Sequence, residues 1–335
     1  MGNAMNWYGK THWLGCMPWA RDIENELLDW SAQPQYLGLV KGHYYSATTH
    51  FSGRWGHHGH TGLLEVVVDD NSRIVFVEFN EKTMENYYVR YFQGVWKRRS
   101  EYGFFQNFHD KIRSAKSGAV TAKCCQYVEQ QILESQRLDG KYDLIAGASF
   151  SVKNMLPLTV ELQEQIQKKN SDILYYGYAE DFGYGITGWL QVRIQNGKII
   201  DCFYDEIMAD HSEQIKYDDL KQFYRLSKYH AQGFEEPFAA GWDRETWLID
   251  FKTLSDTLNA HVCQTQNLLD IEGLPHTDGP DYGKMWDRES RPDGGIVHIK
   301  SKYELPERPR HPSYNNYLSI AAHIDEQLKM DGVLK

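Results

Sequence analysis

The chain has 335 residues, and its 46 acidic residues outnumber its 36 basic ones, which gives a formal net charge of −10. This charge disfavours nucleic acid as a partner, because a basic surface is needed to neutralise phosphates. Hydrophobic residues make up 41% of the chain, but no apolar run reaches the roughly 20 residues that span a bilayer. With no secretory signal readable at its start, we expect a cytoplasmic protein without a membrane span, long enough for two domains.

Three β-rich runs in the first half of the chain recur in the second half with nearly the same spacing. Thr61 matches Thr187, and Glu81 matches Glu206. The runs cover residues 44–51, 61–68 and 73–81 in the first copy and residues 175–182, 187–194 and 198–206 in the second. A further match joins residues 98–102 to residues 225–229. Shared order over so long a stretch indicates an internal duplication.

Each copy begins with strands. Apolar residues stand at every second position, Leu190, Val192 and Ile194, which is the pattern of a strand with one buried face. Asn196-Gly197 then predicts a two-residue hairpin turn, which the first copy replaces with residues 69–72. Helical patterns follow at residues 118–136 and 251–269. Strands followed by helices predict an α+β fold of two tandem homologous domains, each a twisted antiparallel sheet with flanking helices.

The basic run Lys97-Arg98-Arg99 follows the strands of the first copy. A solvated face is the preferred interpretation of this run, and a contact with the phosphate of a flavin or a substrate is the alternative. Tyr102 matches Tyr229 in the alignment of the two copies. Repeated aromatic residues usually lie in a core, and stacking of Tyr102 on a planar ligand is the second interpretation.

A loop of histidines, His57, His58 and His60, occupies the first copy only. An exposed loop or a lid over a ligand is one interpretation. Imidazoles aimed together from a glycine-flanked loop could also bind zinc or another transition metal.

The helix expected over residues 118–136 carries Val128 and Ile132 on its apolar face, with Glu129 and Gln136 elsewhere. Two neighbouring cysteines on this helix are interpreted as packing residues. The five cysteines are odd in number and form no Cys-x-x-Cys pair, which argues against a disulfide framework; they are Cys16, Cys124, Cys125, Cys202 and Cys263.

Residues 143–149, Asp-Leu-Ile-Ala-Gly-Ala-Ser, present a carboxylate, a Gly-Ala turn and a hydroxyl directly after this helix. We call them the motif segment. Gly147 can take a positive φ or let a ligand approach the backbone. Ser149 can present its oxygen at the start of the next element. An ordinary turn between two helices is the alternative.

The motif segment and the duplicated strands resemble the FMN-binding domain family, found in the C and G subunits of sodium-pumping and related quinone reductases and in two-domain extracellular flavoproteins. In that family the pattern D-x-x-[ST]-G-A-[ST] carries FMN through a phosphoester on its last hydroxyl, installed by a flavin transferase. Asp143, Gly147 and Ala148 match this pattern, Ala146 replaces its usual Ser or Thr, and Ser149 would be the acceptor.

The resemblance covers roughly residues 40–275. It implies an FMN-binding protein that acts in electron transfer or as the flavin module of a reductase, with the flavin transferase as a partner. If the protein is an enzyme, it would be an FMN-dependent oxidoreductase, since the cofactor carries the redox chemistry. The cofactor-binding residues expected are Asp143, Gly147, Ala148, Ser149 and Tyr102.

The second copy differs where the first has its motif segment. Residues 270–276 read Asp-Ile-Glu-Gly-Leu-Pro-His, without the acceptor hydroxyl, and Pro275 lacks a backbone N–H that could meet a phosphate. We interpret this stretch as a pseudo-site. A long irregular stretch, with His276, Asp278, Tyr282 and Trp286 as candidates for a second pocket, then precedes a helix expected over residues 314–328.

The expected domains are an N-terminal extension (1–40), a first FMN-binding-like domain (41–170), a degenerate second one (171–278) and a C-terminal wrap with a helix (279–335). Two alternative functions stay open. One is a non-redox module on the same duplicated fold that binds a small ligand. The other is a metal-dependent enzyme that uses the loop of His57, His58 and His60. No catalytic acid or nucleophile can be named.

Overall fold

The computed structural model describes residues 29–51, 59–87, 90–112, 119–147, 149–216, 218–231, 251–271, 274 and 312–334. The strands are β1 (Gly38–His50), β2 (Thr61–Val68), β3 (Ile74–Lys82), β4 (Ile173–Asp181), β5 (Ile186–Gln195) and β6 (Lys198–Met208). The helices are α3 (Tyr102–Ile112), α4 (Thr121–Ser135), α5 (Ser149–Gln167), α7 (Phe251–Thr265) and α8 (Pro312–Met330), with short 3-10 turns η3 (Arg90–Phe92), η4 (Ser212–Gln214) and η5 (Asp218–Phe223).

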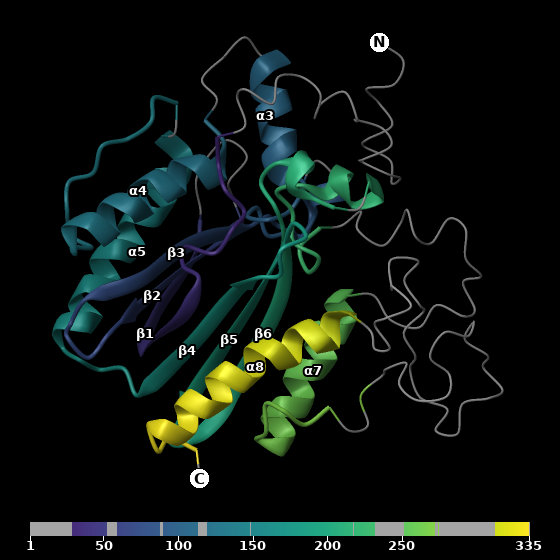
Figure 1. Ribbon diagram of the computed structural model, residues 1–335. Coiled ribbons are helices and arrows are strands. Elements are labelled where there is room, and N and C mark those ends of the chain that lie inside the picture. Colours follow the sequence, from purple (N-terminus) through teal and green to yellow (C-terminus); the bar gives the residue numbers. More distant parts are fainter. Residues whose placement is uncertain are drawn as a thin grey trace. The chain divides into compact units, whose positions relative to one another are not determined.

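The strands follow the order β3-β2-β1-β4-β5-β6, and antiparallel pairs join β1 to β2, β2 to β3 and β5 to β6. Helices pack on these strands, as Figure 1 shows. The architecture is therefore α+β, as the strands followed by helices predict. The helices expected over residues 118–136, 251–269 and 314–328 are confirmed as α4, α7 and α8.

Two compact units divide the chain. Unit 1 comprises residues 1–35, 40–175 and 230–232, and unit 2 comprises residues 36–39, 176–229 and 233–335. In unit 1, α4 packs on β3 and α5 on β2; in unit 2, α7 packs on β6 and α8 on β5. The helices α5 and α8 therefore pack on corresponding strands, each on the second strand of its unit. The finer division into tandem homologous domains, with boundaries near residues 40, 170 and 278, stays a prediction.

The hairpin turn between β5 and β6 is the one that the sequence predicts. Asn196 and Gly197 both take positive φ, 54° and 72°, which is the backbone of a two-residue turn with the right-handed twist of the strands. In unit 1, residues 69–72 form the longer turn. The carboxylate of Asp69 accepts hydrogen bonds from the backbone N–H of Asn71 and Arg73, at 2.9 and 2.8 Å.

A phenylalanine ring covers a glycine at the start of the second strand of each unit. A Cβ on Gly62 would lie 2.6 Å from the ring of Phe51, and a Cβ on Gly188 would lie 2.5 Å from the ring of Phe182. Any side chain there would collide with the ring. The glycines of the matching Thr-Gly pairs therefore leave room for a neighbouring aromatic residue.

The match between residues 98–102 and residues 225–229 is wrong by four residues. Backbone bonds of 2.9 Å join Lys97 to Glu81 in unit 1 and Lys228 to Glu206 in unit 2, so Lys97 corresponds to Lys228. The chain between β6 and this point is longer than its counterpart after β3 and holds η4 and η5. The similarity between residues 98–102 and residues 225–229 lies beyond that insertion, so aligning the copies by it shifts them by four residues.

The strands β3 and β6 are the outer strands of the order, and in each unit a glutamine side chain binds the outer edge. The side chain of Gln136 accepts a bond from the N–H of Ile74 at 2.7 Å and donates one to its carbonyl at 3.0 Å. Gln266 makes the same two bonds with Ile199, at the same distances. Both glutamines follow a helix and have a φ of 58°.

Other side chains continue along the same two edges. On β3, the carboxylate of Glu129 accepts a bond from the N–H of Phe79 at 2.8 Å, and the amide of Gln35 bonds the N–H of Val77. On β6, Asn259 accepts a bond from the N–H of Cys202 at 2.9 Å. Backbone groups that would otherwise lie open to another strand are thereby paired.

Replacing Gln136 with Asn should lower the free energy of unfolding by about 1–2 kcal/mol. Asn tolerates the positive φ, but its amide is one methylene too short to keep both bonds to Ile74, each worth about 1 kcal/mol. Urea unfolding measures the change. Gln130→Asn, at an exposed helix position bonded to Glu134, is the control and should change stability by less than about 0.5 kcal/mol. Equal effects of the two changes would contradict the prediction.

Candidate functional site

The motif segment joins α4 to α5. Gly147 has a φ of 94°, which is one of the two possibilities that its sequence position leaves open, and Ser149 is the first residue of α5. Asp143 and Gly147 are exposed. Ala148 lies outside the described residues. The expected carboxylate, glycine and serine therefore stand on an open connection that ends at a helix start.

The backbone of Asp143 is attached to α4 by one side chain. Gln131 accepts a hydrogen bond from the N–H of Asp143 at 2.8 Å and donates one to its carbonyl at 2.9 Å. These paired bonds hold the peptide groups and leave the carboxylate unused by them. Sequence analysis did not identify Gln131, because nothing in a helical pattern tells which exposed amide will meet a later loop.

The N-terminus of α5 suits an anionic group. The first backbone N–H groups of a helix have no partner within the helix, and the aligned peptide dipoles place partial positive charge there. Phosphate groups bind at such ends. The first residue of α5 is Ser149, which carries a hydroxyl.

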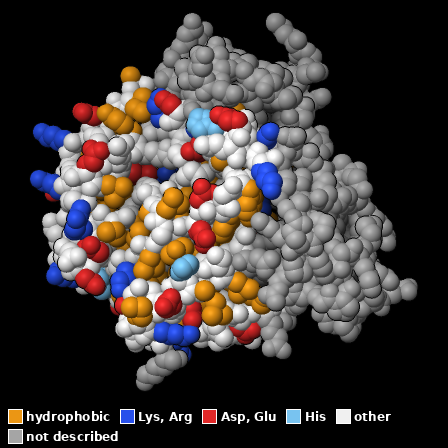
Figure 2. Space-filling view, viewed as in Figure 1, with side chains coloured by type: hydrophobic (Ala, Val, Ile, Leu, Met, Phe, Trp, Pro, Cys, Tyr) orange, Lys and Arg blue, Asp and Glu red, His pale blue; other side chains and the backbone are white. Residues whose placement is uncertain are grey.

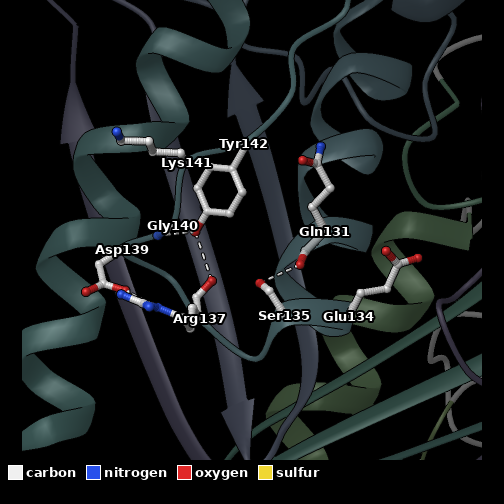
Figure 3. Close-up of a pocket in the computed structure, with 8 residues that line it drawn as sticks. All are labelled: Gln131, Glu134, Ser135, Arg137, Asp139, Gly140, Lys141 and Tyr142. Carbon is white, nitrogen blue, oxygen red and sulfur yellow. Dashed lines mark hydrogen bonds and ion pairs between the residues drawn. The ribbon is translucent and has the colours of Figure 1, made fainter.

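A groove of about 670 Å³ lies beside the motif segment, between the last turns of α4 and the loop that follows them (Figure 3). It is lined by Gln131, Glu134, Ser135, Arg137, Asp139, Gly140, Lys141 and Tyr142. The loop is shaped around one ring, since the hydroxyl of Tyr142 donates to the carbonyl of Arg137 at 2.9 Å and accepts from the N–H of Gly140 at 3.2 Å. Gln131 thus belongs both to the groove and to the attachment of Asp143.

Tyr102 lies in an aromatic cluster. Its ring is buried, with centroids 5.2 Å from Phe92 and 5.5 Å from Phe105, and its hydroxyl lies 2.9 Å from that of Tyr87. The core interpretation of Tyr102 accounts for this position, and its contact with a flavin stays a prediction.

The histidine loop is described only in part, because His57 and His58 lie outside the described residues. His60 is buried, its Nδ1 lies 2.8 Å from Oε1 of Glu81, and its ring packs edge-on against Tyr87. Within the described ranges, no group of three or more His, Cys, Asp or Glu side chains could hold a metal ion. A carboxylate and a tyrosine are among the neighbours of His60.

Glu81 is the centre of a buried polar cluster. Its carboxylate forms an ion pair with Lys97 and accepts a hydrogen bond from Nδ2 of Asn154, on α5, at 2.8 Å. Burial alone would lower the pKa of Lys97, but interactions with Tyr102 and Glu81 raise it above its ordinary value. The ammonium group therefore stays charged in the core at neutral pH.

The basic run was expected on a solvated face, and that interpretation is wrong. Lys97, Arg98 and Arg99 are all buried. Nη1 of Arg98 lies 2.6 Å from Glu129, and the guanidinium of Arg99 makes two bonds of 2.6 Å to Glu78. Figure 2 shows acidic, basic and hydrophobic side chains interspersed over the described part of the viewed face. The basic run adds nothing to that surface.

Each of these three cations has a carboxylate partner. The sequence pattern placed one of these partners away from the apolar face and did not identify the others as partners. Glu78 and Glu81 belong to β3, and Glu129 is buried on α4 although it was expected away from the apolar face. Acidic residues within an otherwise apolar strand were the only sign in the sequence that buried ion pairs would form here. Pairing them with cations requires knowledge of which distant segments meet.

The positive charges of two neighbouring arginines lower the pKa of Glu78. Burial alone would raise it, but the guanidinium groups of Arg98 and Arg99 lower it from 4.5 to about 2. The neighbouring Glu129 behaves in the opposite way, since burial raises its pKa despite its bond to Arg98. Because the folded pKa of Glu78 lies below its unfolded value, its stabilisation is present above pH 4.5 and is lost as the pH falls through about 2.

The cysteines in the described ranges are free. Cys124, Cys125 and Cys202 are buried, and Cys263 is partly buried. Burial raises the pKa of the Cys125 and Cys202 thiols well above the ordinary value. Reactive thiols have a lowered pKa, so the expectation that these residues serve packing is supported.

Comparisons with known proteins give no match: no protein-family model, curated protein or solved structure is similar to the chain. Among the described helices, none is long and apolar enough to cross a membrane. The motif segment and its surroundings therefore carry the functional interpretation.

Replacing Gln131 with Met should speed hydrogen exchange at the amide of Asp143 by about tenfold, while global stability changes little. Met keeps the length of the side chain but neither bond to the Asp143 backbone, and about 1.4 kcal/mol corresponds to a factor of ten. Exchange measured by NMR tests this. An unchanged rate at Asp143, with wild-type stability, would show that Gln131 does not hold the loop.

Glu78→Gln should lower the free energy of unfolding by about 3 kcal/mol at pH 7, the value that corresponds to the pKa shift from 4.5 to about 2. The difference from wild type should shrink as the pH falls from 4.5 towards 2, because the wild-type carboxylate becomes protonated. Urea unfolding at several pH values measures it. Glu85→Gln, at an exposed pair with Lys82, is the control. A difference that is constant with pH would contradict the prediction.

Proposed function

We propose that the chain is an FMN-binding protein that acts in electron transfer or as the flavin module of a reductase, with FMN attached through Ser149. One observation carries this proposal. In the motif segment Asp143, Leu144, Ala146 and Gly147 are exposed, the chain turns at Gly147 with positive φ, and Ser149 is the first residue of a 19-residue helix. This geometry suits a phosphate ester at a helix N-terminus.

The residues of the segment have separate roles. Ser149 provides the oxygen that joins the phosphate, and the first turn of α5 offers N–H groups to the remaining phosphate oxygens. Gly147 lets the chain turn without a side chain beside the ligand. Asp143, held by Gln131, keeps a carboxylate near the acceptor for recognition by a flavin transferase. Bound FMN would supply the redox chemistry.

Unit 2 offers no equivalent acceptor in its sequence. Asp270 is described and lies 3.4 Å from His261, which occupies on α7 the place that Gln131 has on α4. Pro275 and His276 follow it in the sequence and lie outside the described residues. We therefore assign FMN to unit 1 alone.

A second candidate function is a non-redox module that binds a small polar ligand. The groove lined by residues 131–142 favours it, since it is open and its walls carry charged and hydrogen-bonding groups. Ala146, which replaces the usual hydroxyl residue of the family pattern, is consistent with a site that binds without a covalent bond.

Intact mass tests the attachment. Protein co-expressed with a flavin transferase should be heavier by one FMN less water, and Ser149→Ala should lose this mass. Ser151→Ala, two residues further along α5, is the matched control and should keep it. Asp143→Asn should reduce the modified fraction, whereas replacing Pro275 or His276 should leave it unchanged.

The other outcomes separate the candidates. Flavin that denaturation releases from wild-type protein would show binding without a bond. A protein that binds no flavin under any condition would reject the proposal and favour the non-redox module. Loss of the adduct in the Pro275 and His276 variants, with retention in Ser149→Ala, would place the site in unit 2.

A further inference from the structure

The two units contain the same buried polar anchor at the last helix. In unit 1, Nδ2 of Asn154 on α5 donates to Oε2 of Glu81 at 2.8 Å, and Glu81 is paired with Lys97 and His60. The carboxylate and the lysine are both buried. We call Asn154, Glu81 and Lys97 the first anchor.

In unit 2, Nδ2 of Asn316 on α8 donates to Oε1 of Glu206 at 3.1 Å, and Glu206 is paired with Lys228. The hydroxyl of Tyr204 donates to the same carboxylate at 2.7 Å. Asn316, Glu206 and Lys228 form the second anchor. Glu206 and Lys228 correspond to Glu81 and Lys97, because the same backbone bond joins each pair.

The apolar faces of α5 and α8 also correspond. Buried side chains follow each asparagine at the same positions: Met155, Leu158 and Leu162 on α5, and Tyr317, Ile320 and Ile324 on α8. An apolar face alone fixes the position of a helix along its axis weakly, because a shift by one turn brings similar side chains into contact. A single buried polar group can select one register, as it does in coiled coils.

The connections before the two helices differ greatly in length. Residues 136–148 precede α5, whereas residues 266–311 precede α8. Both helices nevertheless place an asparagine on the carboxylate of the corresponding glutamate-lysine pair. The length of the connection therefore does not set the register of the last helix, and the anchor is the feature that both units share.

We propose that Asn154 is a positioning residue for the modification of Ser149, acting through Glu81 and Lys97. This inference rests on the proposed function. Ser149 stands five residues before Asn154, about 7.5 Å along the helix axis, and a slip of one turn would move it by about 5.4 Å. Gln131 holds Asp143 at the other end of the motif segment. The backbone of the motif segment is thus held by Gln131 at Asp143, and the helix that begins with Ser149 is held by Asn154.

The test compares Asn154→Leu with Asn316→Leu. Each change removes one amide bond to a buried carboxylate, so both should lower stability, but only the first acts on the helix that begins with Ser149. The rate of FMN incorporation by a flavin transferase is followed by intact mass, on protein shown to be folded by circular dichroism. Incorporation should slow by about 10- to 100-fold in Asn154→Leu and by less than about twofold in Asn316→Leu.

The other possible results separate the positioning role of Asn154 from the attachment of FMN to Ser149. Wild-type rates in Asn154→Leu, or equal slowing in both variants, would overturn the positioning role while leaving the attachment to Ser149 standing. No adduct in wild type would overturn the attachment through Ser149 and this inference together. If Asn154→Leu does not fold, Asn154→Ala, which removes the amide without adding an apolar group, takes its place with Asn316→Ala as its control.

Discussion

The free backbone edges of β3 and β6 are the constraint on which the rest of the fold depends. An outer strand exposes a row of N–H and C=O groups that can pair with another chain. Here helix side chains take that place, with Gln136 and Gln266 making identical pairs of bonds at the ends of α4 and α7. The helices are therefore held to the strands by directional bonds as well as by apolar burial, which fixes where each connection to the last helix begins.

One buried charge network of unit 1 has an aromatic contact in its place in unit 2. Unit 1 places Glu78, Glu129, Arg98 and Arg99 in one network, whereas unit 2 has Phe203 packed edge-on against Tyr229, at 4.9 Å, beside its own edge strand. Well-packed apolar groups can replace buried ion pairs with little loss of stability. Arg99 also donates to the carbonyl of Ala32 at 2.8 Å, so the network additionally ties the segment before β1 to unit 1.

Local patterns predicted local structure well. The Asn196-Gly197 turn, the positive φ of Gly147 and the helices α4, α7 and α8 all follow from signals within a few residues. The burial of Lys97, Arg98 and Arg99 could not be predicted in this way, because charge favours exposure unless a partner is supplied from elsewhere. Their partners on β3 and α4 are separated from them by about 16 to 31 residues. The roles of Gln131 and Asn154 were missed for the same reason.

The glycines under Phe51 and Phe182 have a consequence for recognising distant relatives. Alanine at Gly62 or Gly188 would bring its methyl group within 2.6 Å of the ring, so the ring would have to move. Substitution there is therefore disfavoured unless the aromatic residue changes as well. A phenylalanine after one strand and a Thr-Gly pair at the start of the next should therefore outlast residues 143–149 in diverging sequences, and would identify members of this fold that have lost Ser149.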